Sequence, residues 1–220
     1  MHGFKPVMNR HLLFISILIL AGVLSISGQN PAASPNPVRP LSIGIVVDNS
    51  GSYRTIFERV MTATNAVIQD LRPGDEAFLV TFVDTSKISL RQEMTSDGQE
   101  LRDAAENMFI QGGSTSILDS VVFAAKYMGS QGSAEGDRSR VLVLITDGDE
   151  RGSAASVEEA VKAARDAGLR IFILGLHEEK FYSKIADRLT RDTGGAKFVP
   201  KVPKESAAMV SSLLSAIRAK

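Results

Sequence analysis

Oxygen-bearing side chains that could bind a metal ion gather in three short stretches of the sequence. Asp48, Ser50 and Ser52 form the first group, Thr115 belongs to the second, and Asp147 belongs to the third. Carboxylates and hydroxyls with no Cys or His nearby suit Mg²⁺, Mn²⁺ or Ca²⁺ better than zinc. The two serines are separated by one glycine, so both hydroxyls could face one ion.

The composition excludes several other kinds of chemistry. Cysteine is absent, which rules out disulfides, thiolate metal sites and a cysteine nucleophile. Lys plus Arg equals Asp plus Glu at 25 each, so no excess charge draws the whole chain to nucleic acid or an anionic membrane. His177 is expected on a surface loop, and no Gly-x-Ser-x-Gly elbow surrounds Ser50, so a serine hydrolase is disfavoured.

The elements that must position these side chains alternate between strands and helices. Short β-branched runs predict strands over 41–47, 77–83, 88–94, 141–146, 171–176 and 197–199. Apolar residues at helical spacing predict helices over 56–71, 99–108, 117–128, 157–164, 181–193 and 209–217. This alternation predicts a doubly wound, Rossmann-like α/β fold with six strands and helices on both faces. The sheet is expected to be mostly parallel, with 88–94 as an antiparallel edge strand because only a short turn precedes it.

The three polar stretches follow a predicted strand or open a predicted helix. In a doubly wound sheet, ligands bind beyond the carboxyl ends of the strands, where the strand order reverses. We therefore expect the three loops to meet at that edge.

These motifs resemble the metal-ion-dependent adhesion site of von Willebrand factor A domains. The resemblance rests on Asp48-x-Ser50-x-Ser52, on Thr115 in a Gly-Gly-Ser-Thr turn, and on Asp147 in Ile-Thr-Asp-Gly, and it covers residues 41–220. It implies that Ser50, Ser52 and Thr115 bind the metal directly. Asp48 and Asp147 would then act through water or hydroxyl hydrogen bonds.

The resemblance also implies a function: a non-enzymatic, metal-dependent protein-binding module for adhesion or scaffolding. The ion, Mg²⁺ or else Mn²⁺ or Ca²⁺, would accept an Asp or Glu carboxylate from a protein partner. The expected partner-binding rim is Asn49, Tyr53, Ser116 and Asp149, with Tyr53 standing where many family members have Met.

Simpler explanations exist for each motif. Asp48 and Ser50 could have the structural role of forming a turn and capping a helix, and Thr115 could simply cap the helix that follows it. Asp149 and Glu150 could be a solvated acidic turn. A Mg²⁺-dependent phosphatase-like hydrolase of the haloacid-dehalogenase type is the alternative function. However, its usual second Asp is Ser50 here, and no lysine lies in an obvious equivalent place.

The N-terminus predicts export. Basic residues precede an apolar run over 12–26, followed by small residues, which is the layout of a secretory signal. Residues 1–28 are therefore expected to be a signal peptide or a retained membrane anchor, and the Pro-rich segment 29–40 a linker. The domain, 41–220, would be periplasmic or secreted, or held at the inner membrane by residues 12–28.

Overall fold

The computed structural model describes residues 39–131 and 138–219. Within them, one six-stranded sheet is built from β1 (Leu41–Asp48), β2 (Glu76–Phe82), β3 (Ile88–Thr95), β4 (Ser139–Thr146), β5 (Leu169–Gly175) and β6 (Lys197–Phe198). Their order across the sheet is β3-β2-β1-β4-β5-β6. Only β3 runs antiparallel to its neighbour. The predicted α/β class and the antiparallel edge strand are confirmed.

The strand order reverses between β1 and β4. The chain moves outward from β1 to β2 and β3, then returns to place β4 on the other side of β1. Val47 pairs in register with Ile145, so Asp48 and Thr146 leave the sheet at the same edge. This edge is the ligand-binding position expected of a doubly wound sheet.

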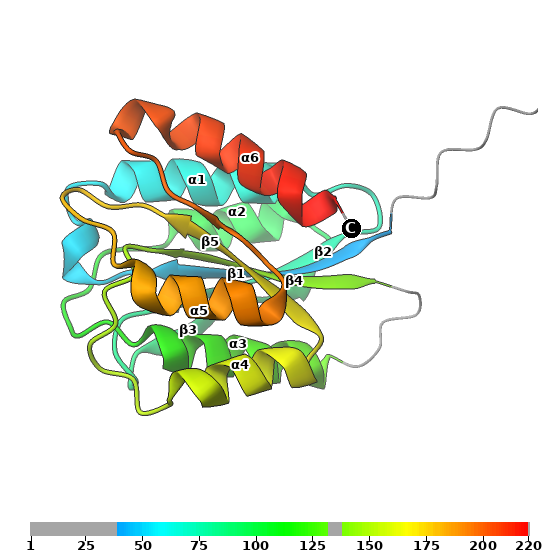
Figure 1. Cartoon of the computed structure of the whole chain (residues 1–220). Helices are drawn as coiled ribbons and strands as arrows, with labels where there is room; N and C mark the ends of the chain where they lie inside the picture. Colours follow the sequence, from blue (N-terminus) through cyan, green and yellow to red (C-terminus); the bar gives the residue numbers. More distant parts are fainter. Residues whose placement is uncertain (1–38, 132–137, 220) are drawn as a thin grey trace, which may run out of the picture. The chain divides into compact units, whose positions relative to one another are not determined.

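In the described part of the chain, α-helices cover both faces of the sheet (Figure 1). On one face lie α1 (Phe57–Gln69), α2 (Gly98–Glu106) and α6 (Ser206–Arg218), and on the other α3 (Ile117–Ser130), α4 (Val157–Asp166) and α5 (Ser183–Thr193). Strand β1 supplies both cores, because Ile43, Ile45 and Val47 point to the first face and Val46 to the second. A strand that is covered by helices on both faces has no polar side, which explains why β1 is a continuous apolar run.

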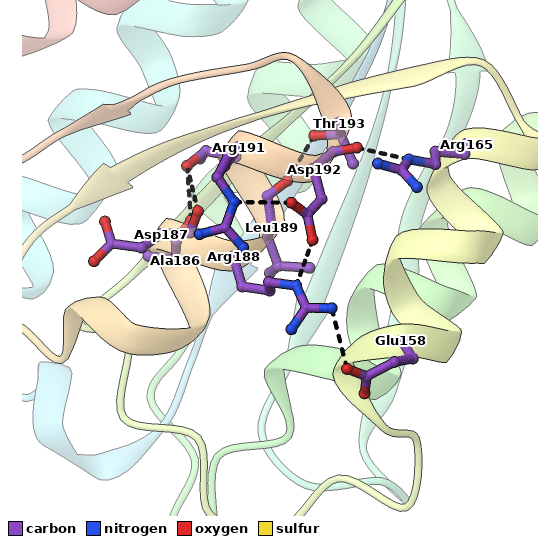
Figure 2. Close-up of polar contacts among 10 residues, drawn as sticks. Glu158, Arg165, Ala186, Asp187, Arg188, Leu189, Arg191, Asp192 and Thr193 are labelled. Atoms are coloured by element: carbon purple, nitrogen blue, oxygen red, sulfur yellow. Dashed lines mark hydrogen bonds and ion pairs between the residues drawn. The ribbon is translucent and has the colours of Figure 1, made fainter.

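Charged residues join α4 and α5 at the surface (Figure 2). Arg188 pairs with Glu158 of α4 at 3.2 Å and with Asp192 one turn further along α5, and the Arg165 Nε donates to the Asp192 carbonyl at 2.7 Å. Exposed pairs of this kind contribute roughly 0–1 kcal/mol each. The buried apolar faces of both helices therefore hold them in place.

Most predicted helix ends differ from the structure by one to three residues. Helix α5 begins at Ser183 rather than at 181, because Phe181 packs against Gly175 instead. Helix α6 begins at Ser206, three residues earlier than predicted, directly after a 3-10 turn over Pro203–Glu205. Helix α1 ends at Gln69, before Leu71.

The export segment predicted over 1–28 and most of the predicted linker 29–40 lie outside the described residues. In the part of the chain that the structure describes, no helix is both long enough and apolar enough to span a membrane.

Candidate functional site

The three predicted polar loops are tied together at the carboxyl edge of the sheet. Thr146 Oγ1 donates a 3.0 Å hydrogen bond to Asp48 Oδ2, which joins the ends of β4 and β1. The Thr115 carbonyl accepts from the Arg151 and Gly152 backbone N–H groups at 2.9 and 3.1 Å, so the loop before α3 is fixed to the loop after β4. The expected convergence of the loops is confirmed.

Asp48 is a fully buried carboxylate without a basic partner in the described ranges 39–131 and 138–219. Its Oδ1 accepts from the Ser50 N–H at 2.9 Å, and its Oδ2 accepts from Thr146. Burial raises the pKa of Asp48 to about 7, the charge of Asp147 adds to this rise, and the hydrogen bonds from Ser50 and Thr146 oppose it. A buried carboxylate beside a second one is costly unless a cation compensates it. The pair therefore fits a bound metal ion.

The hydroxyl donors lie next to these carboxylates. Ser50 Oγ and Ser52 Oγ are 3.1 Å apart, so both hydroxyls share one side of the loop. Ser50, Thr115 and Asp147 are buried, whereas Ser52 is exposed, which leaves access from solvent. Three of the five candidate side chains carry neutral hydroxyls. Among the described residues, no cluster of three or more His, Cys, Asp or Glu residues is arranged to hold a metal.

Helix capping does not account for these hydroxyls. Ser50 precedes the 3-10 turn over Gly51–Tyr53, yet its side chain makes no capping hydrogen bond there. Ser116 is the N-cap residue of α3, and its side chain also makes none. Ser50 is therefore not used as a cap, and Ser116 rather than Thr115 holds the N-cap position of α3, which weakens one of the simpler explanations.

The rim of the site differs from the prediction. A pocket of about 240 Å³ opens over the site, and its lining includes Ser52, Asp147, Asp149, Arg151, Lys180 and Tyr182. Of the four predicted rim residues, Asn49, Tyr53 and Ser116 are buried and only Asp149 keeps exposed surface. We correct the rim accordingly: Asn49 and Ser116 hold loops together from inside, and Tyr53 belongs to the floor of the pocket.

Tyr53 combines a buried ring with an isolated hydroxyl. The ring packs in the core beneath α1, and among the described residues the Oη has no hydrogen-bond partner. Burial, followed by the charges of Asp48 and Asp147, raises the pKa of Tyr53 well above its usual range. The hydroxyl therefore stays protonated and remains a donor.

Glu150 was missed as a positioning residue, because its acidic neighbours suggested a solvated turn. It is half-buried and accepts from the backbone N–H groups of Leu118, Gly152 and Ser153 at 2.8–3.0 Å. One carboxylate thus caps α3 and folds the loop after β4 toward Thr115. The Gly-Asp-Glu sequence gave no local indication, since the partner Leu118 is 32 residues away.

Comparisons with known proteins agree with this architecture. Residues 42–208 match the family model of the von Willebrand factor type A domain. The chain is 28% identical over 176 residues to Matrilin-1 of Homo sapiens, which covers 75% of this chain and 35% of that protein. It is 25% identical over 158 residues to Vitrin of Homo sapiens, covering 69% of this chain and 23% of that protein. The chain thus spans about a third or less of the curated relatives it matches.

Two solved bacterial structures show the same fold. The conserved hypothetical protein BatB from Bacteroides thetaiotaomicron matches with a TM-score of 0.61 and 17% identity, over 80% of this chain and 98% of that one. An aerotolerance-related membrane protein from Bacteroides fragilis matches with a TM-score of 0.63 and 16% identity, again over 80% and 98%. At this level of identity the likeness concerns the fold alone.

Proposed function

The chain belongs to the von Willebrand factor type A domain family, and on this premise we propose that residues 41–220 form a divalent-metal-dependent protein-binding module. The observation that carries the proposal is the fully buried Asp48, which lies close to Asp147 with no basic side chain paired to it in the described part of the chain. Such a carboxylate pair is best explained as half of a cation site.

The residues present fit a hard cation, with Mg²⁺ as the first choice and Mn²⁺ or Ca²⁺ as alternatives. Ser50, Ser52 and Thr115 would bind the ion directly, and Asp48 and Asp147 would hold it through water or hydroxyl hydrogen bonds. When bound, the ion would supply a positive centre that accepts an oxygen anion. Because its direct protein ligands are neutral hydroxyls, little of its charge is cancelled.

A carboxylate of a protein partner fits this electrophilic position. We propose that the partner presents an Asp or Glu to the ion and that this single contact behaves as a hot spot. Replacing that acid by its amide should weaken binding more than changing any single neighbouring residue of the partner.

Two exposed aromatic side chains give the partner an apolar contact beside the ion. Phe109 is 56% exposed, and its carbonyl accepts from Asn49 Nδ2 at 3.0 Å. Tyr182 is 39% exposed, and its N–H donates to the Asp147 carbonyl at 2.9 Å. Each aromatic is thus anchored to a residue at the end of β1 or after β4. Rigid aromatic side chains near a charged centre are common anchors of interfaces.

An enzymatic role is not favoured. The family match points away from a haloacid-dehalogenase-type hydrolase, and Ser50 occupies the position where such an enzyme carries its second Asp. We therefore propose binding, rather than phosphate chemistry, as the task of the site.

We also propose that residues 1–40 direct the domain out of the cytoplasm. The basic, then apolar, then small-residue order of the N-terminus supports this. A reporter fused after Pro40 should cross the inner membrane, and N-terminal sequencing should place the cleavage near Gly28 or show an intact anchor. A reporter retained in the cytoplasm would overturn the proposal.

Metal dependence is tested by thermal unfolding with and without Mg²⁺ or Mn²⁺. Preferential binding to the folded state should raise Tm, and Asp48→Ala or Thr115→Ala should remove that rise. Asp166→Ala and Thr62→Ala are matched controls, because both residues are exposed on helices and bond only within them. If the wild type and the site variants respond identically to metal, the proposal fails.

Partner binding is tested by a pull-down from envelope extract in Mg²⁺ and in chelator. A partner that requires Mg²⁺ and is lost with Asp48→Ala supports the module, whereas equal capture in chelator contradicts it. The folded state of Asp48→Ala is checked by circular dichroism in the same buffer.

A further inference from the structure

The hydroxyl of Tyr53 is an unexplained polar group beneath the candidate metal site. Tyr53 has no exposed surface, and its Oη lacks a hydrogen-bond partner among the residues that the structure describes. The other two tyrosines behave differently: Tyr127 Oη accepts from the Met94 N–H at 2.9 Å, and Tyr182 is partly exposed. A buried hydroxyl without a partner is costly, so its presence calls for a reason.

The core does not require this hydroxyl. The ring of Tyr53 packs among apolar side chains that include Val47, Ile56 and Leu174, and a phenylalanine ring would fill the same space. The hydroxyl is thus the only part of Tyr53 for which the packing offers no purpose.

The backbone of Tyr53 belongs to the turn that carries the proposed metal-binding serines. Tyr53 directly follows Ser52, and its N–H donates to the Ser50 carbonyl at 3.1 Å in the turn Gly51–Tyr53. Together with Ser52 and Asp147, it lines the pocket over the site. The turn that carries both serines therefore also places the Cα of Tyr53 at the site, and burial in the core holds the ring.

Most of the groups that act on the Tyr53 hydroxyl belong to the site, and the exception is Arg59 of α1, whose charge lowers the pKa of Tyr53. Asp48 and Asp147 are close enough for their charges to act on it. The Thr146 hydroxyl also acts on it and lowers the pKa of Tyr53, but no hydrogen bond of normal geometry joins the two; Thr146 donates to Asp48 and accepts from the Gly148 N–H at 3.1 Å. A buried donor near two carboxylates, without a hydrogen-bond partner of normal geometry among the described residues, is suited to an acceptor that arrives with the ion.

We propose that Tyr53 is a positioning residue for the divalent ion, and this inference rests on the proposed function. Its hydroxyl donates a hydrogen bond into the outer coordination sphere, to Asp147 or to a water that Asp147 holds, when the ion is bound. The unpartnered hydroxyl destabilises the metal-free domain, and the hydrogen bond that it forms when the ion binds strengthens metal binding. Partners of this kind orient metal-binding groups, and their loss typically weakens metal affinity by about 10-fold or more.

The test compares Tyr53→Phe with Tyr127→Phe in the full chain, using Mg²⁺ and Mn²⁺ as the only ligands. Calorimetric titration should show affinity about 10-fold weaker for Tyr53→Phe, while the metal-free Tm is unchanged or higher than in the wild type. Tyr127→Phe should lower Tm equally with and without metal and should keep wild-type affinity, because it removes a hydroxyl with a fixed backbone partner.

Tyrosine absorption gives a second measurement. The chain contains three Tyr and no Trp, so a near-UV difference spectrum on adding metal reports the tyrosine side chains. The wild type and Tyr127→Phe should show the full spectrum, and in Tyr53→Phe it should shrink to the part that Tyr182 contributes from the pocket.

The outcomes separate the two levels of the proposal. Equal metal affinity of Tyr53→Phe and wild type would overturn the role of Tyr53 and leave the metal-binding module standing. An equal loss of Tm with and without metal would also overturn it, by showing a purely structural role. If the wild type itself binds neither ion, both the proposed function and this inference fail.

Discussion

The Thr146 hydroxyl joins the two strand-end carboxylate loops by donating a hydrogen bond of 3.0 Å to Asp48 Oδ2. The same hydroxyl accepts from the Gly148 N–H at 3.1 Å, so it fixes the turn that carries Asp147. Asp48 and Asp147 are thereby held relative to each other before any ion binds, which lowers the cost of organising the site.

Replacing Thr146 by valine should separate these two loops while keeping the side-chain volume. We expect the free energy of unfolding to fall by about 1–3 kcal/mol, because buried Asp48 loses one of its donors. Metal affinity should fall as well, since Asp48 is no longer oriented. Urea unfolding and calorimetric titration measure the two effects.

Thr64→Val is the matched control for this prediction. Thr64 is also buried, but its hydroxyl donates to the Val60 carbonyl within α1, away from the site. Metal affinity should stay at the wild-type value in this variant. If Thr146→Val leaves metal affinity as unchanged as Thr64→Val does, the positioning role of Thr146 is wrong.

Glu150→Ala should loosen the loop after β4 from the start of α3. Three backbone N–H groups lose their carboxylate acceptor, so we expect a drop in stability of about 1–3 kcal/mol and weaker metal binding through Thr115. Glu179→Ala changes the same charge at an exposed position of the pocket and should affect stability little. Equal thermal shifts for the two variants would contradict the prediction.

Gly148→Ala should destabilise the domain far more than Gly168→Ala. Both glycines have positive φ, at 80° and 68°, so each alanine would be destabilised by a left-handed backbone conformation. A Cβ on Gly168 meets nothing within 4 Å, whereas one on Gly148 would lie 2.2 Å from the Tyr182 carbonyl oxygen. We expect losses of about 1 and about 3 kcal/mol, measured by urea unfolding. Similar losses would refute the role assigned to this close contact.

Asp75→Asn should give a pH-dependent loss of stability. Burial alone would raise the pKa of Asp75, but hydrogen bonds from Arg218, Arg72 and Leu41 outweigh it and lower the pKa. The stabilisation is therefore present above the unfolded pKa of about 3.9 and is lost as the pH falls through the lower folded value. At pH 7 the variant should be less stable by about 2–4 kcal/mol.

The check is urea unfolding of Asp75→Asn and wild type across the acidic range. The difference between the two should shrink as the pH falls below 4, because the wild-type carboxylate becomes protonated. Asp103→Asn, at an exposed position on α2, controls for a general charge effect. A difference that stays constant from pH 7 to pH 3 would contradict the assigned ion pair with Arg218 at 2.7 Å.

The sequence by itself determined the elements and the edge at which the site forms. Apolar periodicity and turn residues are local properties, so the run at 41–47 and the polar turn after it could be identified without knowing any contact. The residues proposed for the metal site were chosen in the same way, because hydroxyls and carboxylates at strand ends favour a hard cation whatever the packing around them.

Only the tertiary structure decided which of these side chains are covered and which partners they find. Tyr53 and Asn49 looked like surface residues because they follow a strand in a polar loop, yet both are buried. Glu150 looked solvated, yet it caps a helix that begins far away in the sequence. Burial and hydrogen-bond partners depend on the three-dimensional packing of distant segments, and no local periodicity encodes that packing.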